Sequence, residues 1–183
     1  MTSRPSRPQH SVLPPFSQCR SLRCGCMATT TRVRTESHGG ALPWRTVELT
    51  LQVTRSAWLS TTRPDGRPHA APVWFLWTDG AVYFVTPLTS QKGVNLSAQE
   101  YGVLQVGDGD DVVIIEGPTR LVTDASERQA VAERYGAKYV EPVTGERATI
   151  DWPGAALYRL DATKVMAWIY GNVAARTDWR WAS

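Results

Sequence analysis

The chain is 183 residues long and carries a formal net charge of +3 at pH 7, a length that suits one domain with a hydrophobic core rather than two. The positive charge lies in residues 1–40, which hold six arginines and one glutamate, whereas residues 41–183 hold fourteen basic and sixteen acidic side chains. A nucleic-acid-binding domain normally carries its basic excess on the folded surface, so the charge pattern argues against a nucleic-acid partner. No apolar stretch approaches the roughly 20 residues of a membrane helix or resembles a secretion signal, and we expect a cytoplasmic protein without a membrane partner.

Residues 1–43 are predicted to form a disordered basic tail, because this segment is rich in Pro, Ser and Arg and poor in apolar side chains. The chain's cysteines all lie in this tail, at no standard zinc-ligand spacing with His10 or His38: Cys19, Cys24 and Cys26. We therefore expect neither a metal site nor a disulfide framework. Met27 could be the natural start of the protein, and the folded domain is predicted to cover residues 44–183.

Three short strands joined by tight turns are predicted at the start of this domain, over residues 57–62, 68–77 and 82–86. A Pro-Asp-Gly turn separates the first two strands, and an Asp-Gly hairpin turn separates the second and third. Pro68 and Pro72 mark the second strand as irregular or at a sheet edge. The pattern predicts an antiparallel meander, followed by a helix over residues 89–98.

The second half of the domain continues with strands over residues 101–106 and 112–123. Gly117 and Pro118 interrupt the longer strand, which predicts a bulge or bend of the kind that closes small barrels. A helix then begins at Asp124, with a capping pattern to Glu127, and is predicted to end at Gly136. Two closing strands are predicted in the segments AALYRLDAT and KVMAWIYG, so the fold class is mainly β, a small antiparallel barrel with helical insertions.

The segment TPLTSQKGVNLSAQ, residues 86–99, combines two hydroxyls and a lysine where a strand ends and a helix begins. The free amides at a helix start and the helix dipole both favour an anion, so Thr86, Ser90 and Lys92 could bind a phosphate. The alternative interpretation is an ordinary helix cap with one solvated lysine.

The usual catalytic motifs are absent from the predicted domain, which has no G-x-S-x-G sequence, no cysteine, and His69 as its one imidazole. Catalytic residues therefore cannot be named from the sequence. An enzyme built from this chain would take its chemistry from a cofactor, and the phosphate site indicates a phosphate-bearing one. No G-x-G-x-x-G motif is present, so a Rossmann-type dinucleotide site is not expected.

Residues 59–96 carry a D-G-x-P-H hairpin, a P-V-W-F strand, a D-G turn, a strand ending in Thr, and then S-x-K-x-x-N-L. This ordered set resembles the flavin and deazaflavin oxidoreductases of the pyridoxamine 5′-phosphate oxidase superfamily, and a looser resemblance covers about residues 45–181. The resemblance implies an FMN-binding split β-barrel and a homodimer with the cofactor at the subunit interface.

The resemblance also implies which residues bind the cofactor. Thr86, Ser90 and Lys92 would contact the phosphate, with Gln91 and Asn95 nearby. The strand residues Pro72, Val73 and Trp74 would lie along the ring, and Trp179 would reach toward the partner's site, although Asp178 replaces an arginine expected there. By their own sequence context, Trp77 is assigned to the core, His69 to the solvated hairpin or a substrate contact, and Lys138 to the solvent-exposed surface.

The leading functional interpretation is an FMN-dependent oxidoreductase that transfers hydride to an unidentified small molecule, with the deazaflavin F420 as the alternative cofactor. Pyridoxamine phosphate is not the expected substrate, because Val94 stands where a second cation could lie and the C-terminal segment has only Arg176 and Arg180. The loop over residues 136–154 is expected to form the rim of the pocket. Two other interpretations are a non-catalytic flavin- or haem-binding carrier or sensor, and a barrel that mediates interactions without a cofactor.

Overall fold

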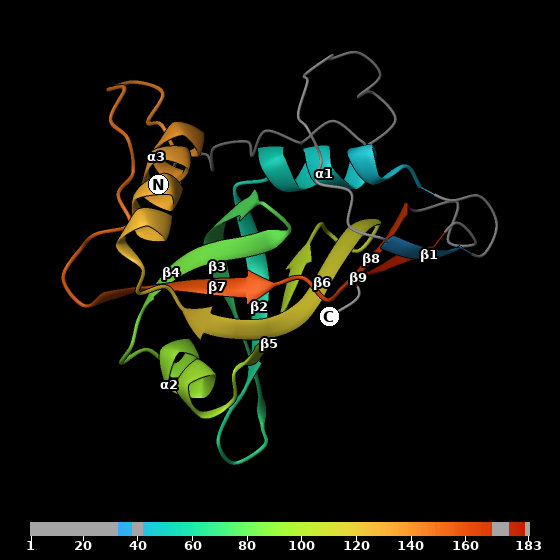
Figure 1. The fold of residues 1–183 in the computed structure, drawn as a ribbon, viewed down its shortest axis with the longest axis horizontal. Coiled ribbons are helices and arrows are strands. Elements are labelled where there is room, and N and C mark those ends of the chain that lie inside the picture. Colours follow the sequence, from blue (N-terminus) through green and yellow to red (C-terminus); the bar gives the residue numbers. More distant parts are fainter. Residues whose placement is uncertain (1–32, 38–41, 170–175, 182–183) are drawn as a thin grey trace, which may run out of the picture.

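The computed structural model describes residues 33–37, 42–169 and 176–181, and within them the chain forms nine strands and three helices. Their order is β1 (Val33–Ser37), α1 (Trp44–Val53), β2 (Ser56–Thr62), β3 (Pro68–Thr78), β4 (Ala81–Pro87), α2 (Gln91–Ala98), β5 (Tyr101–Val106), β6 (Asp111–Leu121), α3 (Ala125–Lys138), β7 (Ala155–Asp161), β8 (Lys164–Ile169) and β9 (Thr177–Trp181). Figure 1 shows the strands curling around one another with α1, α2 and α3 on the outside.

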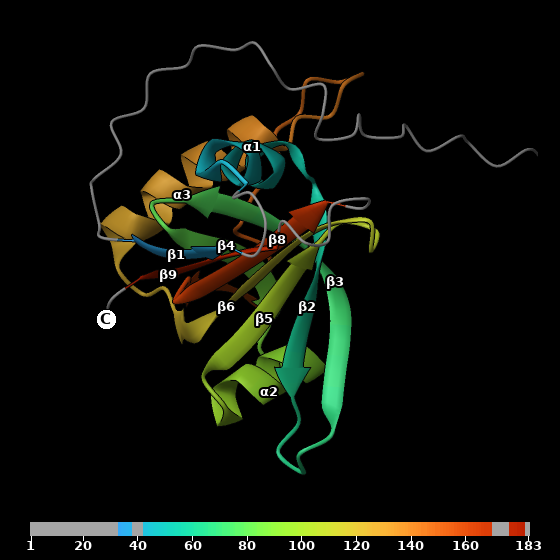
Figure 2. The same cartoon turned by 90° about the vertical axis from the view of Figure 1, so that its right-hand side faces the viewer.

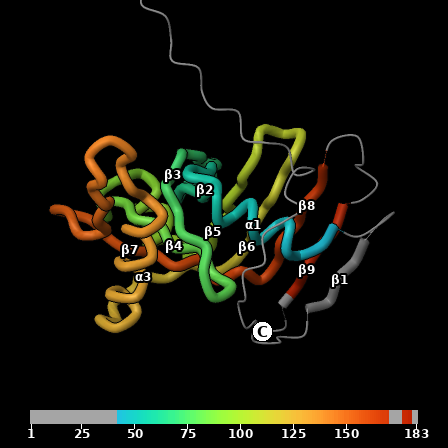
Figure 3. The backbone as a smooth tube through the Cα atoms, turned by 90° about the horizontal axis from the view of Figure 1, so that it is seen from above, coloured from blue at the N-terminus to red at the C-terminus, as the bar shows by residue number. Residues whose placement is uncertain are grey.

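Six antiparallel strands close into a barrel in the order β6-β5-β2-β3-β4-β7, with β7 pairing back onto β6. The other three strands extend the sheet from β6 in the order β8-β9-β1, on the side of the molecule away from α3 (Figure 3). The architecture is a split β-barrel, which confirms the predicted fold class.

The bend predicted at Gly117 and Pro118 is where β6 changes partners. Before it, residues 111–116 pair with β8, and after it, residues 119–121 pair with β7. A Cβ atom on Gly117 would lie 1.7 Å from the carbonyl oxygen of Asp161, so only glycine allows the two backbones to approach this closely. This glycine therefore contributes directly to closing the barrel.

Strand β3 changes partners in the same way, from β2 for residues 68–74 to β4 for residues 75–78. At the change, the amide of Phe75 donates to the hydroxyl of Tyr139 at 2.8 Å, and that hydroxyl lies 2.6 Å from the carbonyl oxygen of Arg55. Tyr139 is 1% exposed, and its hydroxyl provides hydrogen bonds to backbone groups that have no strand partner at this point. The backbone of Trp74, next to Phe75, is fixed by this arrangement.

Two clusters of buried apolar side chains hold these elements together. The larger one fills the barrel and includes Leu59, Phe75 and Trp77, with Trp44 of α1 packed against it. The smaller one lies under α3 and includes Tyr83, Val131 and Tyr135. The assignment of Trp77 to the core is confirmed.

Three features of the fold were not predicted. Helix α1 follows Pro43 without a side-chain cap, so the usual start signal is missing. Strand β1 forms inside the segment predicted to be a disordered tail, because it pairs with β9. Strand β9 itself is the third feature that the sequence did not predict. Most of the rest of that tail lies outside the described residues, namely residues 1–32 and 38–41.

Lys138 is not the solvent-exposed residue that the sequence predicted, because α3 continues beyond Gly136 and ends at this lysine. Its ammonium donates to the carbonyl oxygens of Leu51 at 3.1 Å and Phe75 at 2.9 Å. Burial, together with the nearby positive charge of Arg55, lowers the pKa of Lys138 to about 8. Lys138 therefore links the ends of α1 and α3 to β3.

Candidate cofactor site

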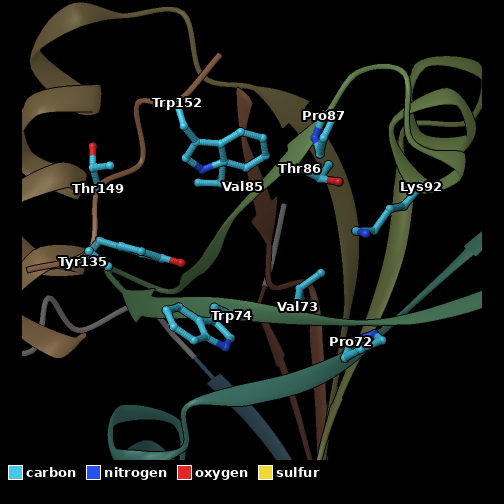
Figure 4. A pocket seen from close by; sticks show the side chains of 11 residues that line it. Pro72, Val73, Trp74, Val85, Thr86, Pro87, Lys92, Tyr135, Thr149 and Trp152 are labelled. Atoms are coloured by element: carbon cyan, nitrogen blue, oxygen red, sulfur yellow. The ribbon is translucent and has the colours of Figure 1, made fainter. Parts of the chain in front are cut away.

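A pocket of about 300 Å³ opens between the middle of β3, the end of β4 and the start of α2 on one side, and α3 with the following loop on the other. Figure 4 shows Lys92 and Thr86 at one end of it, and Tyr135 and Trp152 at the other. The lining residues are Pro72, Val73, Trp74, Val85, Thr86, Pro87, Lys92, Tyr135, Ala148, Thr149 and Trp152. Five of the nine predicted cofactor-binding residues are thus brought together.

The end of β4 and the start of α2 form the polar end of the pocket. Thr86 is 1% exposed, and its hydroxyl lies 2.9 Å from that of Ser90. Ser90 is the N-cap of α2, and its hydroxyl accepts from the amide of Gly93 at 3.1 Å. The preceding amides, those of Gln91 and Lys92, are at the positions that a helix leaves for a ligand or solvent.

Lys92 points into the pocket toward Thr86 (Figure 4) and forms no ion pair or hydrogen bond with any residue in the described part of the chain. Arg63, on the β2–β3 turn, donates to Oε1 of Gln91 at 2.8 Å and so lies beside the first turn of α2, although it does not line the pocket. The Lys92 ammonium and the free amides at the helix start are donors suited to a phosphate, and the Arg63 guanidinium adds a positive charge beside α2. The residues present therefore fit a phosphate-bearing group.

Ser90, Gln91 and Asn95 do not line the pocket but hold α2 in place. Asn95 is fully buried, donates to Oγ1 of Thr61 at 2.8 Å and accepts from Gln91 at 2.8 Å. Because Thr61 lies on β2, this chain of hydrogen bonds fixes α2 against the β2–β3 hairpin beside it (Figure 2). For Ser90, the structure shows the contacts of an ordinary cap, the alternative that the sequence left open.

Helix α2 lies unusually close to the turn before it. A Cβ atom on Gly93 would lie 2.3 Å from the carbonyl oxygen of Pro87 and 2.6 Å from that of Leu88. Any larger residue would therefore push α2 away from β4 and move Lys92 relative to Thr86.

The wall along β3 consists of Pro72, Val73 and Trp74. The indole of Trp74 is 48% exposed and stacks on the ring of Tyr139, with centroids 4.8 Å apart and an angle of 8° between the planes. The guanidinium of Arg55 lies 5.5 Å from the centroid of the Trp74 ring. This stacking holds a flat apolar surface at the side of the pocket.

The opposite end of the pocket contains residues that the sequence did not identify. Thr149 and Trp152 come from the loop after α3, which confirms that the predicted loop contributes to the rim. Tyr135 lies on α3, and no sequence motif marks it as a pocket residue. It is 5% exposed, and burial raises the pKa of its phenol to about 12.

Trp179 does not line the pocket, because its side chain is 3% exposed and packs edge-on against Trp44 in the core. His69 lies on β3, with Nδ1 at 3.5 Å from Oγ1 of Thr61. Among the described residues, no group of three His, Cys, Asp or Glu side chains could hold a metal ion. No helix in the described part of the chain is long and apolar enough to cross a membrane.

The fold is a split barrel, and its pocket carries residues that suit a phosphate-bearing group. The chain belongs to the pyridoxamine 5′-phosphate oxidase family, whose model matches residues 45–169. This agrees with the resemblance carried by the motifs of β3, β4 and α2.

Solved structures share the fold at low sequence identity. The conserved hypothetical protein Rv2991 from Mycobacterium tuberculosis is 22% identical, with a TM-score of 0.57 over 73% of this chain and 89% of its own. General Stress Protein 26 from Bacillus anthracis is 20% identical, with a TM-score of 0.50 over 66% and 89%. The heme storage protein HutZ from Vibrio cholerae is 15% identical, with a TM-score of 0.52 over 63% and 87%. None of the curated protein sequences matches this chain.

Proposed function

We propose that this protein is an FMN-dependent oxidoreductase acting on a small molecule. The observation that carries the proposal is the ammonium of Lys92, which faces the buried Thr86 across the pocket and has no protein anion to neutralise it among the described residues. A phosphate would provide the negative counter-charge for this lysine. Membership of the family supports a flavin as the group that bears the phosphate.

When bound, FMN supplies the hydride transfer, and the protein's residues bind and orient it. Lys92 and the first amides of α2 would hold the phosphate beside Thr86, and the backbone of Val73 and Trp74 would lie along the ring. The exposed face of Trp74 and the nearby Trp152 add aromatic surface to this part of the pocket. The chain's contribution is thus positioning and a largely apolar surrounding, and no residue here is assigned proton transfer.

F420 is the second candidate cofactor, because Arg63 adds a cation near the phosphate end of the pocket. The longer acidic tail of F420 would use such a charge outside the pocket. FMN is preferred, since the other arginine of this turn, Arg67, is already paired with Asp65 at 2.7 Å.

A carrier or sensor that binds a flavin or haem without turnover is the alternative function. The pocket lining has no His, Cys or Met, and the raised pKa of its one tyrosine, Tyr135, disfavours the phenolate form that binds iron, so haem is the less favoured ligand. Denaturing the purified protein and identifying the released chromophore by absorbance and mass distinguishes FMN, F420, haem and no cofactor. Release of haem, or of nothing after incubation with FMN, would contradict the proposal; reduction of the bound flavin by an electron donor then separates an enzyme from a carrier.

The functional unit is proposed to be a homodimer. Trp58 of β2 is 52% exposed and lies on the same outer face of the barrel as Trp74, an unusual amount of aromatic surface for solvent contact. A second copy of the chain would cover this face beside the cofactor. Sedimentation should show a dimer that Trp58→Arg dissociates; a monomer loaded with cofactor at micromolar concentration would contradict this.

A further inference from the structure

The hydroxyl of Tyr135 is a polar group that the proposed cofactor site does not use. The side chain is 5% exposed, and the hydroxyl points into the pocket (Figure 4). It has no hydrogen-bond partner among the described residues. A hydroxyl that faces a pocket without a protein partner must be satisfied by water or by a bound molecule, so it is available to a ligand.

The other three buried tyrosines of the described residues differ in this respect. The hydroxyl of Tyr139 contacts the backbone of Arg55 and Phe75, and that of Tyr83 donates to Glu127 at 2.9 Å. Tyr158 also lacks a partner in the described part of the chain, but it lies in the core, stacked on Phe84, and does not line the pocket. Tyr135 alone among these four tyrosines presents a free hydroxyl to the pocket.

The surroundings of Tyr135 restrict the class of ligand. Its neighbours in this half of the pocket are Trp74, Thr149 and Trp152, and no charged side chain lines it there. Aromatic side chains bind flat apolar molecules, and a charged group would find no counter-ion at this end. The phenol is protonated at neutral pH, as an ordinary tyrosine is, and burial raises its pKa further to about 12, so it can donate a hydrogen bond.

We propose that Tyr135 donates a hydrogen bond to the carbonyl-type oxygen of a planar, uncharged substrate bound between Trp74 and Trp152. This inference rests on the proposed function, in which the polar edge of the cofactor ring is served by the β3 backbone and the phosphate by Lys92. This leaves the Tyr135 hydroxyl for the substrate, which is the second molecule in the pocket. Tyr135 would orient that molecule and select for an acceptor at one position.

The test uses the full-length protein saturated with oxidised FMN and two bicyclic probes of similar size, chromone, which has a ketone oxygen, and naphthalene, which has none. Dissociation constants are measured by calorimetry or ligand-observed NMR for wild type, Tyr135→Phe and Tyr158→Phe. Tyr135→Phe removes only the hydroxyl and should weaken chromone binding by about two- to tenfold. Naphthalene binding should be equal in all three proteins, and Tyr158→Phe should leave both constants unchanged.

Equal chromone affinity in wild type and Tyr135→Phe, or no chromone binding to wild type, would overturn the inference. The affinities of FMN and riboflavin for the same variants separate the two proposals. If Tyr135→Phe weakens both flavins and not chromone, the hydroxyl serves the flavin ring, so this inference fails while the proposed function stands. If wild type binds no FMN, the proposed function fails, and the chromone titration of the flavin-free protein decides the role of Tyr135 by itself.

Discussion

The hydroxyl of Ser90 lies 2.9 Å from the hydroxyl of Thr86 and 3.1 Å from the amide nitrogen of Gly93, so one small side chain joins the end of β4 to the first turn of α2. The same hydroxyl donates to the carbonyl oxygen of Pro87 at 2.7 Å. The position of Lys92, two residues later, depends on this junction.

Ser90→Ala is expected to lower the free energy of unfolding by about 1 kcal/mol, because it removes the cap of α2. Urea denaturation measures the change. Ser97→Ala is the matched control, since Ser97 bonds only to the carbonyl oxygen of Gly93 one turn earlier, and alanine is the better helix former. A loss of stability in Ser97→Ala as large as in Ser90→Ala would show that the cap is not special.

Gly93→Ala is expected to destabilise the protein by about 1–3 kcal/mol, because the added methyl group would overlap the carbonyl oxygens of Pro87 and Leu88. Gly136→Ala places the same group in α3, where the nearest atom, the carbonyl oxygen of Ala148, is 3.3 Å away. That variant should cost much less, since alanine also favours the helix. Thermal unfolding of both variants makes the comparison, and equal losses would argue against the close approach of α2.

The contribution of Lys138 to stability is expected to depend on pH. Its pKa is about 8 in the folded protein and near 10.4 in an unfolded chain, so the unfolded state binds more protons between these values. Stability due to this lysine therefore rises as the pH increases from about 8 to 10.5. The difference in unfolding free energy between wild type and Lys138→Met, measured across this range, should shift in favour of wild type; a constant difference would contradict the lowered pKa.

Much of the barrel could be predicted because its strands and turns carry local signals. The Asp-Gly turn between β3 and β4, the paired glycine and proline in β6, and the cap of α2 each specify their own geometry. Strands β1 and β9 have no such signal, since each is fixed by pairing with the other and, for β9, with β8. Helix α1 likewise depends on burying Val47 and Leu51 against the barrel.

The polar end of the pocket could be predicted for the same reason, because Thr86 and Lys92, which line it, and Ser90, which caps α2 beside them, are close in sequence. The other end could not, since Tyr135, Thr149 and Trp152 reach the pocket only after α3 folds back over β3 and β4. Tyr135 also has the spacing of an ordinary core residue on α3. That its hydroxyl faces the pocket without a protein partner becomes visible only in three dimensions.

The most direct test of the account is the affinity of FMN and riboflavin for wild type, Lys92→Ala and Lys164→Ala, measured by flavin fluorescence. Lys164 is the matched lysine, because it pairs with Glu116 at 3.5 Å and does not line the pocket. If Lys92 holds the phosphate, its loss removes a charge-assisted contact of roughly 1.5–3 kcal/mol, so FMN affinity should fall by about ten- to a hundredfold. Riboflavin, which has no phosphate, should bind all three proteins equally, and Lys164→Ala should leave both affinities unchanged. Equal FMN affinity in wild type and Lys92→Ala would contradict the central claim that this pocket binds the cofactor by its phosphate.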